Sequence, residues 1–191
     1  MRELIAQTAA RFMAEGASDF ATAKRKAARQ LGATDTHCLP TNEQIEAALR
    51  SYQQLYLGEQ QQEHVAELRR IAADAMRRLE KYSPLLTGSV LSGTAGPYAN
   101  INLHLFAEDS KAVELDLLNK NMTFEHGEKR FRSGERTLTI PTLTLQCENI
   151  PVECALFTPQ QQRLALRSPV DGGIMERATL RQLELLLNDL A

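Results

Sequence analysis

The hydrophobic pattern of this chain changes near residues 81–89, from a purely helical period to one that includes strands, and that change constrains the fold more than any other feature. Before it, apolar residues recur at the three- and four-residue spacing of amphipathic helices. After it, they alternate along short runs rich in β-forming residues, as in "INLHLF". We therefore expect a helical bundle over residues 1–82, followed by an α+β domain over residues 83–191 that contains a small mixed sheet with flanking helices.

The first region contains four helical patterns. Ser18 or Asp19 is expected to cap the second helix, and Thr41 with Gln44 forms a capping box at the start of the third. The fourth helix is expected over roughly Gln61–Lys81, with Arg69, Arg70, Arg77 and Arg78 on the face opposite its apolar stripe.

The second region alternates strands and helices. "EDSKAVELDLLNKN" predicts a helix capped by Asp109 or Ser110, with Val113, Leu117 and Leu118 facing the sheet. "MTFEHGEKRFR" predicts a strand and turn, and "RTLTIPTLTLQCENIPVECALF" predicts two strands joined at Glu148–Pro151. A last amphipathic helix is expected from about Glu176 to Leu190.

Composition limits the classes of partner. The net charge is −2 among 191 residues, so global charge does not direct the protein to nucleic acid or to membranes. Apolar stretches are too short to cross a bilayer, and the first residues do not resemble a secretion signal. Cys38, Cys147 and Cys154 lack a metal-binding spacing. We expect them to be reduced and mostly buried, and the protein to be cytoplasmic.

A glycine–serine pair, ten residues and then "NINL" form the most specific motif in the chain. This pattern resembles the signature of the nucleotidyltransferase (DNA polymerase β-like) superfamily: Gly–Gly/Ser, a spacer, then Asp–hydrophobic–Asp–hydrophobic. "IPVECALF" is similar to a strand in the head domain of tRNA nucleotidyltransferases and poly(A) polymerases. The resemblance covers about residues 83–158 and implies a nucleotidyltransferase-like α+β domain.

The resemblance assigns roles to particular residues. Gly88 and Ser89 match the turn that holds nucleotide phosphates through backbone N–H groups and a hydroxyl. Asn100 and Asn102 stand where the two catalytic aspartates belong, and Glu153 matches the third carboxylate. Residues two apart on a strand share one face, so three carboxylates of this kind converge and hold two Mg²⁺ ions.

The two asparagines change what such a site can bind. An amide oxygen is a neutral and weaker ligand than a carboxylate, so we expect weakened binding of Mg²⁺ or Mn²⁺ through Glu153 and Asn102. His104 shares the strand face of Asn102 and adds a softer ligand. Together these residues are expected to hold one softer metal, or a nucleotide without metal. The alternative interpretation is a polar, solvent-facing side of a strand.

Other candidates carry weaker signals. Lys24, Arg25, Lys26 and Arg29 gather on one short helix, where they form a local basic patch for RNA or merely a solvated face. The arginines of the fourth helix are a possible extension of that patch beside the cleft. Glu114 and Asp116 sit two apart, but the helical pattern around them indicates surface residues.

Two functional hypotheses follow. In the first, the protein binds a nucleoside triphosphate and transfers a nucleoside monophosphate to a hydroxyl on RNA, protein or a small molecule. In the second, it is a catalytically inactive pseudoenzyme of the same fold that acts as a nucleotide-binding, RNA-binding or protein-interaction module. The asparagine pair favours the second hypothesis, whereas the intact Gly–Ser turn and Glu153 favour the first. The sequence does not indicate an oligomeric state.

Overall fold

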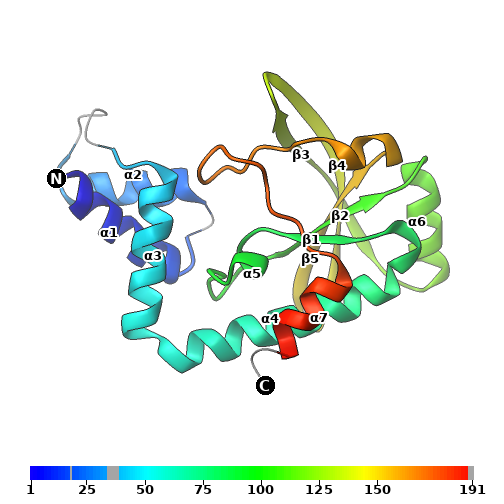
Figure 1. The fold of residues 1–191 in the computed structure, drawn as a ribbon, viewed down its shortest axis with the longest axis horizontal. Coiled ribbons are helices and arrows are strands. Elements are labelled where there is room, and N and C mark those ends of the chain that lie inside the picture. Colours follow the sequence, from blue (N-terminus) through cyan, green and yellow to red (C-terminus); the bar gives the residue numbers. More distant parts are fainter. Residues whose placement is uncertain (18, 34–38, 189–191) are drawn as a thin grey trace. The chain divides into compact units, whose positions relative to one another are not determined.

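The computed structural model describes residues 1–17, 19–33 and 39–188 (Figure 1). Contacts divide the chain into two compact units. The first contains Met1–Val65, Gly93–Ala99 and Ser168–Gly173, and the second contains Ala66–Ser92, Asn100–Arg167 and Ile174–Ala191. This division falls within a helix rather than between residues 82 and 83, and each unit is assembled from separate stretches of chain.

The helices expected in the first region are present, with small changes in their ends. They are α1 (Arg2–Ala14), α2 (Phe20–Gln30), α3 (Asn42–Tyr56) and α4 (Gly58–Arg78), which begins in the first unit and continues in the second. Asp19 caps α2 by accepting a hydrogen bond from the Thr22 N–H at 2.8 Å. Thr41 and Gln44 form the expected capping box of α3. Ser18 lies outside the described residues.

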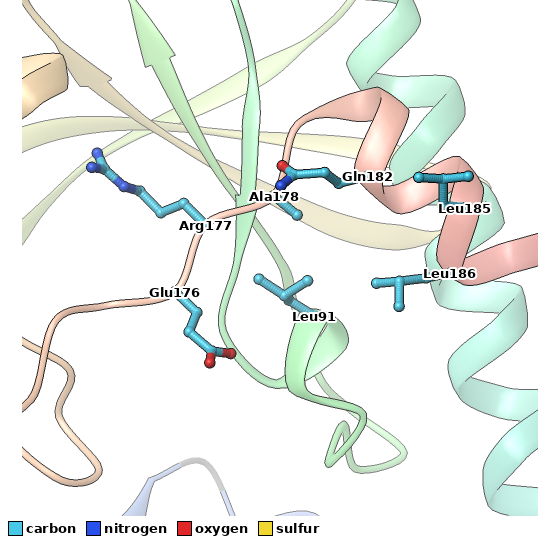
Figure 2. A pocket seen from close by; sticks show the side chains of 7 residues that line it. All are labelled: Leu91, Glu176, Arg177, Ala178, Gln182, Leu185 and Leu186. Carbon is cyan, nitrogen blue, oxygen red and sulfur yellow. The ribbon is translucent and has the colours of Figure 1, made fainter. Parts of the chain in front are cut away.

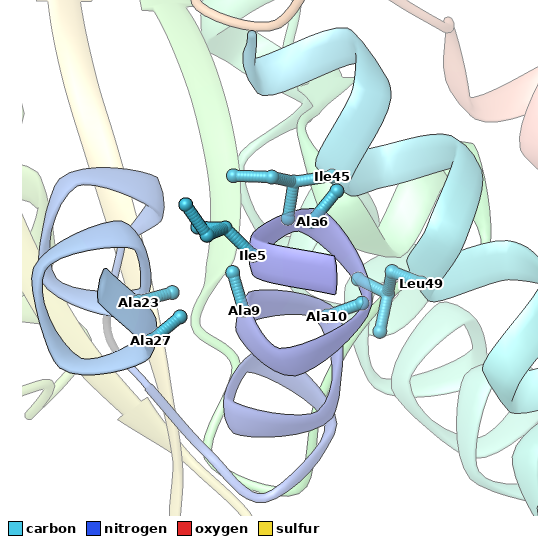
Figure 3. Close-up of a cluster of buried hydrophobic side chains, with 8 residues drawn as sticks. All are labelled: Ile5, Ala6, Ala9, Ala10, Ala23, Ala27, Ile45 and Leu49. Carbon is cyan, nitrogen blue, oxygen red and sulfur yellow. The ribbon is translucent and has the colours of Figure 1, made fainter. Parts of the chain in front are cut away.

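Alanines dominate the core of the first unit (Figure 3). The buried side chains of α1 face those of α2 and α3, and small residues let the helix backbones approach closely. The cluster consists of Ile5, Ala6, Ala9, Ala10, Ala23, Ala27, Ile45 and Leu49.

The spacer that follows the Gly–Ser turn is an ordered part of the first unit. Side chains from α3 and α4 donate hydrogen bonds to its backbone carbonyls, which binds residues 93–96 to the two helices. The donors and acceptors are Gln53 Nε2 to Thr94 O (3.3 Å), Gln61 Nε2 to Ala95 O (2.9 Å) and His64 Nε2 to Gly96 O (3.0 Å). Because the Gly96 carbonyl can only accept, His64 carries a proton on Nε2.

The second unit contains a five-stranded mixed sheet in the order β1-β2-β5-β4-β3. β2 and β5 are parallel, and the other neighbours are antiparallel. This confirms the expected α+β class and the small mixed sheet. The strands are β1 (Leu85–Thr87), β2 (Ile101–Phe106), β3 (Phe124–Ser133), β4 (Arg136–Cys147) and β5 (Ile150–Phe157).

Short helices connect or flank these strands. They are η2 (Glu80–Tyr82), α5 (Ser89–Ser92), α6 (Ser110–Asn119), η3 (Pro159–Arg163) and α7 (Leu180–Asn188). Asp109 caps α6 as expected, and Val113 and Leu117 are buried. Leu118, however, is 59% exposed, so the prediction that it faces the sheet was wrong. α7 is bound to α4 by an ion pair between Arg77 and Glu184 at 2.8 Å (Figure 1).

Two local features fix the ends of these elements. Glu148 and Asn149 both have positive φ (51° and 65°), as a two-residue hairpin turn requires, so β4 and β5 meet where the sequence predicted. The last helix starts at Leu180 rather than Glu176, because Ala178 forms a β-bridge with Leu86 of β1.

The two faces of β2 differ in character. Ile101, Leu103 and Leu105 are completely buried on one face. The other face carries Asn102, His104 and Phe106. Of these three, Phe106 belongs to a second hydrophobic core, which lies in the second unit. That core contains Phe106, Phe131, Ile140, Ala155, Phe157 and Leu166.

We predict that Gln61→Ala destabilises the first unit by about 1–2 kcal/mol, because the part-buried Gly93 and Ala95 carbonyls lose their side-chain donor. Gln62→Ala, on an exposed position of the same helix, is the matched control and should change stability by less than about 0.5 kcal/mol. Urea unfolding of both variants measures the difference. Equal stabilities would show that the helices do not hold the spacer.

Candidate functional site

The pairing of three strands places the predicted motif residues side by side. In the parallel pair of β2 and β5, Asn102 lies opposite Glu153. In the antiparallel pair of β1 and β2, Asn102 lies opposite Thr87, which immediately precedes the Gly–Ser turn. Because facing residues in a sheet direct their side chains to the same side, Asn102 and Glu153 are neighbours on one face.

The Gly–Ser turn lies next to Asn102 and is open to solvent. Gly88 is exposed with φ of +80°, and Ser89 is partly exposed. A Cβ atom at Gly88 would lie 3.3 Å from Asn102 Nδ2, so a larger residue would press on that amide as well as strain the backbone. Asn100 is exposed at the start of β2, and its backbone oxygen accepts a hydrogen bond from Asn102 Nδ2 at 3.2 Å.

The side chain of Lys129, on β3, lies between those of Asn102 and Glu153. No pattern in the sequence singled out this lysine. Its ammonium group donates to Asn102 Oδ1 at 2.9 Å and forms an ion pair with Glu153 Oε1. The side chain of Lys129 is 41% exposed, and that of Glu153 is 23% exposed. The positive charge therefore stands beside the carboxylate that was expected to bind a metal.

These residues do not fit Mg²⁺ or Mn²⁺. Divalent magnesium selects carboxylate and water oxygens, but here one carboxylate remains and an ammonium group already neutralises it. Across residues 1–17, 19–33 and 39–188, there is no group of three or more His, Cys, Asp or Glu side chains able to hold a metal ion. The prediction of a weakened metal site at Glu153 and Asn102 thus finds no suitable ligand set in the described part of the chain.

His104 shares the face of Asn102, as the alternation predicted, but it does not line an open cleft. Its ring is only 1% exposed and lies 5.2 Å from the ring of Phe131 and 4.7 Å from that of Phe157. Burial, and the positive charges of Arg177 and Lys129, lower the pKa of His104 to about 3. The imidazole is therefore a neutral part of the apolar floor beneath the site.

The arginines of α4 do not form a free basic wall. Arg69 donates to the Val90 and Leu91 carbonyls at 3.1 and 2.8 Å, and so holds α5 in place after the Gly–Ser turn. Arg70 pairs with Glu67 and Glu148, and Arg77 pairs with Asp74 and Glu184. At least three of the four guanidinium groups thus serve internal contacts.

The basic patch of α2 lies in the first unit. Lys24 is partly buried, whereas Arg25, Lys26 and Arg29 are exposed, and Lys26 lies 6.0 Å from the centre of the Phe12 ring. Burial lowers the pKa of Lys24. Contact of this patch with RNA remains a prediction.

Other sequence-predicted residues have structural roles. Glu114 and Asp116 lie on α6 and pair with His126 and Lys120, as expected for surface residues. Cys147 and Cys154 are free, buried thiols, and burial raises the pKa of each. Cys38 lies outside the described residues.

Comparison with protein-family models, with curated proteins and with solved structures finds no match to this chain. Among the described residues, no helix is both long and apolar enough to cross a membrane.

We predict that His104 makes the protein less stable as the pH falls from about 6.5 to about 3. The unfolded chain takes up a proton near pH 6.5, whereas the folded ring stays neutral until about pH 3. The free energy of unfolding should thus lose up to about 1.4 kcal/mol per pH unit within that window.

His104→Phe should reduce this slope, since it leaves no group to protonate among the aromatic rings. The control His126→Phe alters an exposed ring on β3 and leaves His104 in place, so the slope should persist. Denaturant unfolding between pH 7 and pH 4 measures the effect. Identical slopes in wild type and His104→Phe would refute it.

Proposed function

We propose that this protein is a metal-independent nucleotide-binding module with a nucleotidyltransferase-like site, and that it does not transfer nucleoside monophosphates. The observation that carries the proposal is the position of Lys129. Its ammonium group lies between Asn102 and Glu153, where a two-metal enzyme of this kind would place divalent cations. A fixed organic cation thus takes the place of an exchangeable inorganic one.

The donor count of Lys129 supports direct binding of phosphate. An ammonium group has three N–H donors, of which Asn102 and Glu153 accept two. The third donor is available to a phosphate oxygen, because the side chain is 41% exposed. A lysine bound in this way supplies a point charge to an anion without any metal ion.

The Gly–Ser turn supports the same ligand. Gly88 is exposed and lies against Asn102. Its φ is positive, a backbone conformation that glycine adopts more easily than other residues. The hydroxyl of Ser89 and the N–H groups of the turn are neutral donors, and the turn lies against Asn102, the residue that Lys129 contacts. The ligand class that uses both kinds of donor is a phosphorylated nucleotide.

Transfer of a nucleoside monophosphate to a hydroxyl acceptor is the second candidate function. The open Gly–Ser turn and the neighbouring Asn102 and Glu153 favour it. It requires Glu153 to leave Lys129 and bind metal, so the two candidates make opposite predictions about metal dependence.

We predict that the protein binds ATP, GTP, CTP or UTP at least as tightly in EDTA as in Mg²⁺, because the protein supplies the positive charge. Calorimetry with each triphosphate measures this directly. Lys129→Met should weaken binding by about ten-fold or more, as expected for loss of a charge-assisted hydrogen bond. Glu153→Gln should leave the affinity unchanged or raise it, since it removes a negative charge beside the phosphates.

The enzyme hypothesis predicts the reverse pattern. Binding would require Mg²⁺ or Mn²⁺, and labelled nucleotide would be transferred to cellular RNA or another acceptor in wild type but not in Glu153→Ala. Such transfer would overturn the proposal, and so would absence of binding to all four triphosphates under both conditions.

A restoration experiment tests the geometry independently of nucleotide binding. The variant Lys129→Met, Asn100→Asp, Asn102→Asp presents three carboxylates without the competing ammonium group, so we expect it to gain affinity for Mn²⁺. Electron paramagnetic resonance of free Mn²⁺ measures the gain. The matched control is Lys129→Met alone, which should bind Mn²⁺ much more weakly than the triple variant. Equal Mn²⁺ binding by the two variants would show that these side chains do not converge.

A further inference from the structure

A short extended segment runs along the free edge of β1, beside the Gly–Ser turn. The Leu86 N–H donates to the Ala178 carbonyl, and the Ala178 N–H donates to the Leu86 carbonyl, both at 2.8 Å. The hydroxyl of Thr87 donates to the Glu176 carbonyl at 2.9 Å. These bonds fix the three residues 176–178 as an added edge of the sheet.

The register of this edge determines where Arg177 lies. In an antiparallel bridge that pairs Leu86 with Ala178, the preceding residue Arg177 stands opposite Thr87. Leu86 and Ala178 are 0% and 5% exposed on one face. Arg177 therefore belongs to the opposite face, which it shares with Thr87 and Asn102.

The side chain of Arg177 extends away from the neighbouring apolar pocket. That pocket has a volume of about 440 Å³, and Leu91, Leu185 and Leu186 provide much of its lining. Figure 2 shows the guanidinium group directed away from Leu185 and Leu186 of α7. Only part of the Arg177 side chain thus lines the pocket, and its guanidinium group is directed away from it.

The guanidinium group lacks a counter-ion in the described part of the chain. Arg177 is half-buried, and no described carboxylate lies within 4.0 Å of it. Its hydrogen bond to the Leu164 carbonyl, at 3.4 Å, is long and engages one of five N–H donors. A half-buried cation with one long hydrogen bond and no counter-ion among the described residues is suited to bind an anion.

Lys129 and Arg177 approach the site from opposite edges of the sheet. Lys129 comes from β3, and Arg177 comes from the segment beside β1. After burial, the positive charges of both groups also lower the pKa of His104, which shares this face of the sheet. Glu153 already offsets part of the charge of Lys129, whereas Arg177 adds a positive charge that no described carboxylate within 4.0 Å offsets.

We propose that Arg177 is a second cationic contact of this site and binds the terminal phosphates of a nucleoside triphosphate, alongside Lys129 and the Gly88–Ser89 turn. This inference rests on the proposed nucleotide-binding function and specifies its ligand class. Two separate cations on the face of the sheet that carries Asn102 favour a polyphosphate over a single phosphate, since a longer chain of phosphates can engage both groups.

The test uses the full chain in EDTA, with ATP, AMP and inorganic triphosphate as probes in calorimetry. Arg177→Gln should weaken binding of ATP and of inorganic triphosphate by about ten-fold or more, and should affect AMP much less. Arg177→Lys should restore part of the affinity, since it keeps the charge but loses the forked donors. Arg181→Gln, an exposed arginine on α7, is the matched control and should change each affinity by less than about two-fold.

A measurement on the wild-type protein avoids dependence on how well the variants fold. Saturating ATP should protect Arg177 from modification by phenylglyoxal, as read by mass spectrometry, while Arg181 is modified equally with and without ATP. If wild type binds ATP but Arg177→Gln binds it equally, or Arg177 is not protected, the role of Arg177 is refuted and nucleotide binding stands. If wild type binds none of the three probes, both proposals fail.

Discussion

Strands β2 and β5 run parallel, and a parallel pair cannot be joined by a tight turn. Helix α6 and the β3–β4 hairpin fill the intervening chain, so the pair joins segments that are distant in the sequence. The register of this pair sets Asn102 beside Glu153, and β1 brings Gly88 next to Asn102. The candidate site depends on that pairing.

Charge distinguishes this site from a metal-dependent one of similar layout. Asn100 and Asn102 carry no charge, and Lys129 places a positive charge next to the carboxylate of Glu153. Such a distribution of charge favours anions over cations.

The spacer between the Gly–Ser turn and β2 is also held by residues that are distant from it in the sequence. Residues 93–99 belong to the first unit, where side chains of α3 and α4 hold the carbonyls of residues 93–96. In the second unit, Arg69 holds the Val90 and Leu91 carbonyls of α5. The chain that follows Gly88 is thus held by a group distant in sequence, which reduces the conformational freedom that the turn would lose on binding a ligand.

The sequence by itself determined the local elements: the helices, the capping box at Thr41, the other two caps to within one residue, a turn within Glu148–Pro151, and the alternation along β2. These depend on neighbouring residues, so periodicity and capping patterns reveal them. Only the tertiary structure decided that Lys129, which is 27 residues from Asn102 and 24 from Glu153, fills the expected metal position. It also decided that His104 is buried and that Arg177 stands beside β1. The physical reason is that charge pairing and burial arise from contacts between distant strands, which no local pattern encodes.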